Sequence, residues 1–302
     1  MKSVAVKRRR RLPADVVSVN IVGYLLIGFF ALICVVPFYL VIVASFTSNS
    51  SLIRNGYPLI LTEIDLQSYL LCLKNPTAIL RSYGTTIGVT LVGTFCSVIM
   101  ATMTGYVLSR KDFPWRNKIS FFFFFTTLFN GGLVPWYMLC VRYLKFKNSY
   151  FGLILPLMFS VWNMIIAKSF MAGIPSEITE SAKIDGANDM VIYVKLILPL
   201  TKPLIATLGL FSALAYWNDW YNCMLYITNE DMFTLQYYLQ RVLGSAEAMR
   251  IVAEKSGIAL TSIPLEGMKM AMTVIATGPI VLLYPFVQRY FVKGLTIGAV
   301  KG

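Results

Sequence analysis

Long apolar segments joined by shorter polar ones give this chain its pattern. A helix needs about 20 consecutive apolar residues to cross a bilayer. Six segments reach that length: Ile21–Phe46, Tyr83–Ser109, Ile119–Cys140, Phe151–Ala172, Leu204–Ile227 and Gly267–Val292. The pattern predicts an all-α polytopic membrane protein with six transmembrane helices. The even number of spans places the N- and C-termini on the same side.

A polar stretch, residues 176–203, separates the fourth and fifth apolar segments. Pro175 followed by Ser176 is typical of a helix start, and Gly186 followed by Asn188 is typical of a break and a restart. Its charged residues are Glu177, Glu180, Lys183, Asp185, Asp189, Lys195 and Lys202. We predict two short helices at the membrane surface, with charged groups available to a soluble partner. The alternative is an ordinary solvated loop.

After the break, the polar stretch carries apolar residues at helical spacing. These are Met190, Val191, Val194, Ile197 and Leu198, which predict one apolar stripe on a helix. Pro199 and Pro203 are expected to end this piece just before the next apolar segment.

Composition supports the membrane interpretation. Of the 302 residues, 57% are hydrophobic and only 14% are charged, with a mean hydropathy of +0.67. A soluble domain usually carries about a quarter charged residues. We predict a basic cytoplasmic tail, residues 1–20, followed by one transmembrane domain, residues 21–302.

The net charge is +13, and the basic residues are distributed as expected for a membrane protein. Basic residues gather beside apolar segments, as Lys7, Arg8, Arg9, Arg10 and Arg11 in the tail and as Arg110, Lys111, Arg116 and Lys118 in a short loop. The positive-inside rule then places the tail, this loop and the 176–203 stretch in the cytoplasm. One outer loop, with Arg142, Lys145 and Lys147, is more basic than the rule predicts. No basic soluble module is present, so a nucleic-acid partner is not expected.

The five cysteines are scattered and the chain has no histidine. The cysteines predict neither a disulfide framework nor a zinc site. The commonest general base and the commonest metal ligand are both missing. No metal site and no catalytic residue is predicted.

Two apolar segments carry polar groups that are candidates for the substrate pathway. In the third, Asn130-Gly131-Gly132 interrupts the helix, either for substrate contact or for close helix packing at the glycines. In the fifth, the candidates are Trp217, Asn218, Asp219, Trp220 and Tyr221. Aromatic faces with amide and carboxylate groups suit a sugar, but Trp and Tyr also form ordinary interfacial belts.

The polar stretch resembles the EAA loop in the membrane subunits of bacterial ABC importers. The resemblance rests on Glu180-Ser181-Ala182, Asp185-Gly186-Ala187 and Leu196-Ile197-Leu198-Pro199. The family pattern is Glu-Ala-Ala, two residues, Asp-Gly-Ala, then an aliphatic residue two before Leu-Pro. Ser181 stands where the family most often has Ala, and Leu196 fills the aliphatic position.

Further segments resemble carbohydrate importer permeases, and most closely the LplC-type branch associated with oligosaccharide uptake. They are Phe129–Pro135, Phe151–Pro156, Trp217–Trp220 and the ending Phe291–Thr296. The resemblance covers nearly the whole chain from the first span onward. It implies a type I ABC importer permease fold and a subunit of an ATP-driven carbohydrate importer in the bacterial cytoplasmic membrane.

The resemblance also implies the partners. These are a second homologous permease, two ATPase subunits and an extracellular or periplasmic solute-binding protein. The chain has no GxxxxGK[ST] sequence, so ATP and Mg are expected on the ATPase subunits and no cofactor on this chain. By resemblance, the residues that couple to the ATPase are Glu180, Ser181, Ala182, Asp185, Gly186, Ala187, Leu196 and Pro199.

Three other functions remain open on the sequence. The first is an ABC importer for peptides or amino acids, against which the Trp- and Asn-rich fifth segment favours sugar. The second is an intramembrane enzyme, which would need a catalytic constellation. The third is a secondary transporter, which should show inverted repeats and paired buried charges.

Overall fold

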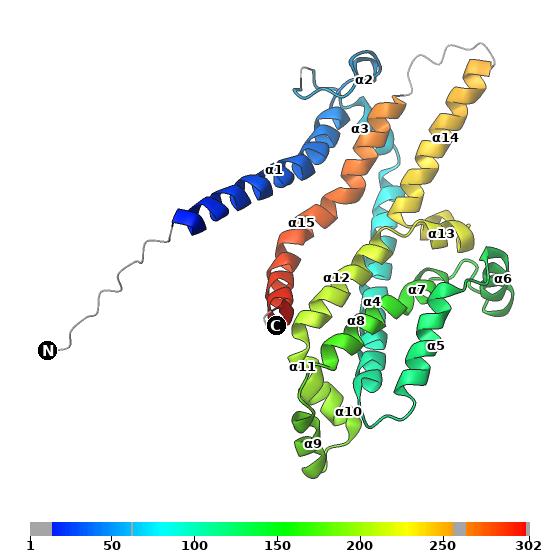
Figure 1. Cartoon of the computed structure of the whole chain (residues 1–302). Coiled ribbons are helices and arrows are strands. Elements are labelled where there is room, and N and C mark those ends of the chain that lie inside the picture. The colour runs from blue at the N-terminus through cyan, green and yellow to red at the C-terminus, as the bar shows by residue number, and fades with distance from the viewer. Residues whose placement is uncertain (1–13, 62, 256–263, 300–302) are drawn as a thin grey trace. The chain divides into compact units, whose positions relative to one another are not determined.

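The computed structural model describes residues 14–61, 63–255 and 264–299, in which every regular element is a helix (Figure 1). The all-α prediction is therefore confirmed for these residues. The basic residues Lys7–Arg11 of the predicted tail lie outside them. The described chain forms two compact units, residues 14–71 with 264–274 and residues 72–255 with 275–299.

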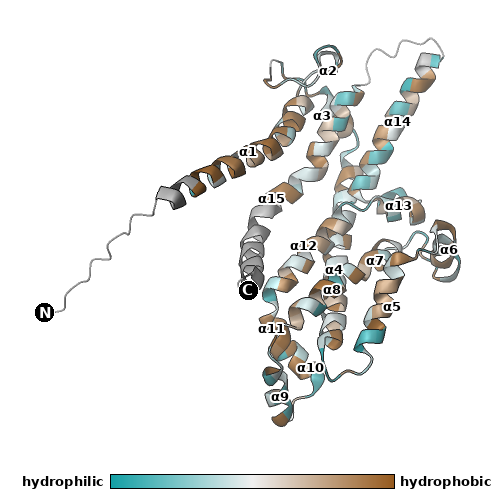
Figure 2. Ribbon diagram, in the orientation of Figure 1, coloured by the Kyte–Doolittle hydropathy of each residue, from teal (hydrophilic) through white to brown (hydrophobic). Residues whose placement is uncertain are grey.

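The first unit is built on a long apolar helix. It contains α1 (Ala14–Ser45), α2 (Asn49–Asn55), α3 (Gln67–Cys72) and the first turns of α15 (Leu265–Ala299). α1 begins inside the predicted tail, and its residues from Val19 to Ser45 are mostly hydrophobic (Figure 2). Within its apolar span, Val19–Ser45, only 6% of the apolar 18-residue window is buried in the chain. Such a surface requires lipid or a partner subunit around it.

Polar side chains join the short elements of the first unit. The Oδ1 atom of Asn49 accepts a hydrogen bond from the backbone N–H of Glu266 at 3.1 Å, which caps the start of α15. The hydroxyl of Tyr69 donates to the Oγ atom of Ser45 at 2.8 Å, which ties α3 to the end of α1. The first bond holds the start of α15 against α2, and the second holds α3 against α1.

The second unit is organised around α4 (Pro76–Ser109), which packs most extensively on α8 (Val161–Met171) and α12 (Lys202–Trp217). Its other helices are α5 (Arg116–Leu128), α6 (Leu133–Met138), α7 (Phe151–Met158), α9 (Ser176–Ile184), α10 (Asp189–Ile192), α11 (Leu198–Leu200), α13 (Tyr221–Tyr226) and α14 (Leu235–Lys255). Two π-helical turns, η1 (Leu139–Tyr143) and η2 (Tyr193–Ile197), and a 3₁₀ turn, η3 (Glu230–Met232), complete it.

Small and hydroxyl residues let α4 approach its neighbours closely. A Cβ atom on Gly105 would lie 2.5 Å from the Cβ atom of Ala167 in α8. The amide of Asn163 in α8 donates to the hydroxyl of Ser212 in α12 at 3.2 Å, and that hydroxyl donates to Ser97 in α4 at 3.1 Å. Small residues and buried hydrogen bonds are the usual means of joining helices in membranes.

By length and composition, up to six spans are present in the described residues. Val19–Ser45, Pro76–Ser109 and Leu265–Leu282 are long and apolar enough alone. Three further helix pairs qualify as broken spans, with bends of 113° between α5 and the α6–η1 segment, 45° between α7 and α8, and 84° between the α10–α11 segment and α12. The first two bends lie within the third and fourth predicted segments, whereas the 84° bend lies at Thr201, before the fifth.

The fourth segment, Phe151–Ala172, is not one continuous helix. α7 ends at Met158, and α8 restarts after Ser160, whose Oγ atom accepts from the backbone N–H of Asn163 at 3.3 Å. Pro156 lacks the N–H that would bond to the preceding turn, which weakens the helix directly before this cap.

The fifth segment, Leu204–Ile227, is also not one continuous helix. α12 ends at Trp217 and α13 begins at Tyr221. The Asp219 carboxylate accepts from the backbone N–H of Asn222 at 3.1 Å and from its side-chain amide at 3.0 Å. A carboxylate that bonds the first N–H groups of a new helix favours a restart over continuation.

Candidate functional site

The polar stretch forms two helices that meet at a glycine turn, as predicted. α9 begins at Ser176 after Pro175 and ends in a Schellman motif, in which the N–H of Ala187 donates to the carbonyl of Ala182 at 2.9 Å. Gly186 has φ +79°, a backbone conformation that side chains with a Cβ atom disfavour. Asn188 then caps α10, because its Oδ1 atom accepts from the N–H of Val191 at 2.8 Å.

The second half of the stretch agrees with the prediction only in part. Its end is as predicted, because the helical piece stops at Leu200, one residue after Pro199, and an 84° bend separates it from α12, which begins at Lys202 directly before Pro203. The apolar stripe is not as predicted. Of the predicted apolar stripe, only Ile197 is buried, whereas Met190, Val191 and Val194 are exposed.

The buried face of this segment is set by the π-helical turn. Ile192, Tyr193 and Ile197 are 0–6% exposed and pack in a core with Ala101 of α4 and Leu204 of α12. The π turn changes the angular spacing of the side chains, which simple helical periodicity did not anticipate.

The two helices present a mixed surface to a partner. Ile184, at the end of α9, is 87% exposed, and the carboxylates of Glu180 and Asp185 are exposed without an ion pair among the described residues. Ser181 is exposed and Ala182 is buried against the core. Lys183 and Asp189, by contrast, form ion pairs within the chain.

Four charged side chains join the end of α4 to both helices. We call Arg110, Asp112, Lys183 and Asp189 the charge cluster. Arg110 caps α4, donates through Nε to Asp112 Oδ1 at 2.9 Å, and pairs through its other nitrogens with Asp112 and Asp189. Lys183 Nζ lies 2.9 Å from Asp112 Oδ2. Arg110 and Lys183 hold the pKa of the Asp112 carboxyl well below its ordinary value.

Aromatic rings pack beside the charge cluster. The guanidinium of Arg110 lies 5.7 Å from the ring centre of Tyr106, and that ring lies 5.5 Å from the ring of Tyr193. The hydroxyls of Tyr193 and Thr102 are 2.8 Å apart. The last two turns of α4 are therefore joined to α10 and η2 by both buried and charged contacts.

A cavity of about 690 Å³ lies beside the charge cluster. Its walls come from the end of α4, the turn between α8 and α9, and α9 itself, and include Arg110, Lys111, Glu177, Glu180 and Lys183. A surface that is hollowed and charged in this way suits a polar protein partner.

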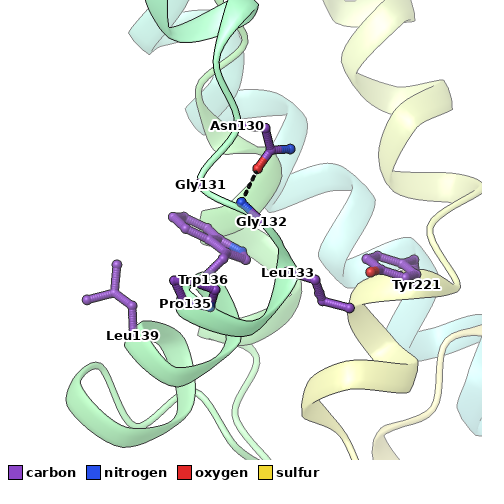
Figure 3. A pocket seen from close by; sticks show the side chains of 8 residues that line it. All are labelled: Asn130, Gly131, Gly132, Leu133, Pro135, Trp136, Leu139 and Tyr221. Atoms are coloured by element: carbon purple, nitrogen blue, oxygen red, sulfur yellow. Dashed lines mark hydrogen bonds between the residues drawn. The ribbon is translucent and has the colours of Figure 1, made fainter.

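The predicted break in the third segment is confirmed at Asn130-Gly131-Gly132. Gly132 has φ +88°, and its N–H donates to Asn130 Oδ1 at 2.8 Å (Figure 3). A Cβ atom on Gly131 would meet nothing within 4 Å. The interpretation that these glycines allow close helix packing is therefore wrong within the described part of this chain. The positive φ of the turn is what favours glycine at position 132.

A cavity of about 510 Å³ opens at this break (Figure 3). Asn130 and Trp136 line it from one side, and Leu133 points toward Tyr221 on α13. Trp136 and Tyr221 are 45% and 41% exposed. Exposed aromatic faces beside an amide form the kind of surface that binds a sugar ring.

The remaining pathway candidates separate into structural and exposed residues. Trp217 is buried, and its Nε1 donates to the carbonyl of Ala276 at 3.0 Å. The Asp219 carboxylate accepts hydrogen bonds from Asn222 in the first turn of α13. Asn218 and Trp220 are exposed, and the ring of Trp220 contacts Tyr221 edge-on at 5.9 Å. Only Asn130 and Tyr221 of the six candidates line the same cavity.

The sequence interpretation missed the charge cluster. The sequence pattern indicates Arg110 only as one of the basic residues of a cytoplasmic loop, and it indicates no role for Asp112. Their relevance depends on contacts with residues more than 70 positions away in the chain. A weak signal was available, since Asp112 is the one acid in a basic loop.

Comparison with known proteins identifies the family. No protein-family model matches this chain. Over 282 residues it is 39% identical to the polygalacturonan/rhamnogalacturonan transport system permease protein YtcP of Bacillus subtilis (strain 168), covering 93% of this chain and 97% of that protein. It is 35% identical over 284 residues to protein LplC of the same organism, covering 94% and 95%.

A solved structure agrees in fold. The bacterial ABC transporter involved in the import of the acidic polysaccharide alginate has a chain with a TM-score of 0.75 and 28% sequence identity, covering 94% of this chain and 100% of that one. The resemblance seen in the sequence is confirmed, including its LplC-type branch. These relatives are transport subunits of membrane-embedded importers, not enzymes. The chain therefore belongs to the permease subunits of carbohydrate ABC transporters and is an integral membrane protein.

Proposed function

We propose that this permease is half of a heterodimeric pore in the bacterial plasma membrane, crossing it six times with both termini inside. ATP hydrolysis then takes place on two separate ATPase subunits, and an external binding protein delivers the substrate. The coupling loop, α9 to α11, docks on an ATPase subunit through Glu180, Asp185 and the exposed Ile184. The support is the glycine turn that joins two short helices and leaves these side chains exposed.

We infer further that the substrate is an oligosaccharide that carries carboxylates. YtcP is named for polygalacturonan and rhamnogalacturonan, and the alginate importer for an acidic polysaccharide. Galacturonate and alginate units are uronates, so both relatives point to an anionic sugar.

The outer loop supports an anionic substrate. Its basic residues, Arg142, Lys145 and Lys147, are exposed and have no carboxylate partner among the described residues. By contrast, Arg81 pairs with Asp231 and Arg241 with Glu230. Unpaired positive charge at the entrance of a path raises the local concentration of an anion.

Backbone geometry fixes this basic loop. Lys145 and Asn148 both have positive φ, +55° and +50°, although neither is glycine. The Oδ1 atom of Asn148 accepts from the N–H groups of Thr228 and Asn229 at 2.7 and 3.0 Å, which holds the loop against the end of α13. A lysine in the left-handed region costs more than the asparagine or glycine usual there.

Uptake by the reconstituted importer tests this proposal. The complete complex in proteoliposomes is supplied with ATP and with either trigalacturonate or the neutral maltotriose. We expect uptake of trigalacturonate to exceed that of maltotriose. Equal uptake of the two sugars, or preference for the neutral one, would contradict an anionic substrate.

The matched variant is Lys145→Asn, which removes the charge and suits the left-handed backbone. We expect the KM for trigalacturonate to rise about two- to fivefold at low salt, with little change at high salt, because exposed charges are screened. A KM that does not change at low salt would remove the outer loop from substrate capture.

A further inference from the structure

The charge cluster has a placement that the chain's covalent connections do not explain. The coupling loop is joined covalently to α8 at one end and to α12 at the other. Helix α4, the axis of the second unit, has no such connection to the loop. Arg110, at the end of α4, supplies one through Asp189 and, by way of Asp112, through Lys183.

The two contacts lie on opposite sides of the glycine turn. Lys183 is in the last turn of α9, before Gly186, and Asp189 is in the first turn of α10, after it. A Cβ atom on Gly186 would meet nothing within 4 Å, so packing against the turn residue itself does not set the angle between the two helices. The cluster therefore constrains both helices relative to each other and to α4.

The guanidinium group is suited to this double contact. Its planar fork bonds both oxygens of Asp112 and still reaches Asp189, and only 15% of the Arg110 side chain is exposed. A lysine ammonium is a single point of charge and cannot reproduce the fork. The Tyr106 ring beneath it restricts the side chain further.

We propose that Arg110 is a positioning residue that makes α9, α10 and the end of α4 move as one body when the ATPase subunits close. This rests on the coupling role proposed above for α9 to α11. Force then reaches α4 directly, besides the covalent route through α8 and α12. Without Arg110 the loop still docks on the ATPase subunit, but its movement is transmitted less effectively to α4.

Hydrogen exchange in the whole importer complex tests this without a sugar. A non-hydrolysable ATP analogue is added to the wild type, Arg110→Ala and Arg110→Lys, and exchange is measured in residues 110–115 and 176–192. In the wild type we expect both segments to change together. In the variants we expect the change to persist in 176–192 and to be lost in 110–115.

Transport gives the second readout. We expect the amount of trigalacturonate imported per ATP hydrolysed to fall about threefold or more in Arg110→Ala and by a smaller factor in Arg110→Lys. Arg116→Ala is the matched control, because it removes one positive charge at the end of the same loop, and Arg116 neither belongs to the charge cluster nor lines the cavity beside it. It should keep the wild-type ratio.

The outcomes separate the two proposals. A wild-type exchange response in 110–115, in assembled complexes of either Arg110 variant, would overturn the role of Arg110. Should Arg110→Ala fail to assemble, Arg110→Lys alone decides, since it keeps the charge and most of the volume. No nucleotide-dependent change in 176–192 of the wild type would instead overturn the coupling role of the loop.

Discussion

Individual residues of the coupling loop are placed by backbone requirements as much as by contacts. Gly186 has a left-handed backbone in open space, so its role is conformational. Ala182 is buried beneath the same turn and accepts the bond from Ala187 that closes it. Ser181, where the family has alanine, is exposed, which explains why the hydroxyl is accommodated there.

Substitution of Gly186 should uncouple transport while leaving the membrane helices intact. A leucine at φ +79° costs about 1–2 kcal/mol locally, so the turn is expected to rearrange and to change the angle between α9 and α10. We expect Gly186→Leu to assemble at normal levels and to hydrolyse ATP with reduced uptake per ATP. Gly186→Asn, which tolerates the left-handed region, should remain close to the wild type. Normal uptake in the leucine variant would contradict the conformational role of Gly186.

Acidification should leave the charge cluster intact over the physiological range. The pKa of Asp112 is lowered in the folded protein by Arg110 and Lys183, so its contribution is present above the ordinary carboxyl value of about 3.9. That contribution is lost only as the pH falls through the lower, folded pKa. We expect exchange protection of residues 110–115, corrected for intrinsic rates, to show no step between pH 5 and 8. A step in that window that is absent in Asp112→Asn would contradict this.

At the scale of elements, α4 is the helix against which the others are placed. Its glycine and hydroxyl positions determine how near α8 and α12 approach, and its last turns hold the coupling loop. Length and hydropathy located all six apolar segments. The break in the third segment follows from its glycines, but the breaks in the fourth and fifth were not located, since they depend on the Ser160 and Asp219 caps within otherwise apolar sequence.

The candidate site was predictable to the extent that it is local. The glycine turn and the Asn188 cap follow from neighbouring residues, and both predictions are confirmed. The buried face of η2 was missed because a π-helical turn has no signal in hydrophobic periodicity. The charge cluster was missed because Arg110 and Asp189 meet only through the packing of α4 on the loop.

Closer packing at the α4–α8 contact should destabilise the second unit. In Gly105→Ala the new methyl group would lie 2.5 Å from the Ala167 Cβ atom and 2.9 Å from the backbone nitrogen of Lys168, so the helices must move apart. Overpacking of this kind costs about 1–3 kcal/mol. We expect a lower melting temperature for the purified complex. Gly88→Ala, in the same helix with open space around it, is the control and should not lower it. Equal melting temperatures would contradict a tight contact.

At the scale of the whole molecule, the proposed topology places the coupling loop in the cytoplasm and the residue 47–66 segment outside. Two exposed positions report the sides: Ile184 at the end of α9 is 87% exposed, and Tyr57 after α2 is 53% exposed. In a chain whose five native cysteines are replaced, Ile184→Cys or Tyr57→Cys is treated with a membrane-impermeant maleimide. We expect Tyr57→Cys to react in right-side-out vesicles and Ile184→Cys only in inside-out ones. Reaction of Ile184→Cys from the outside would place the loop where no ATPase could reach it, and the proposed transmission of force would then be wrong.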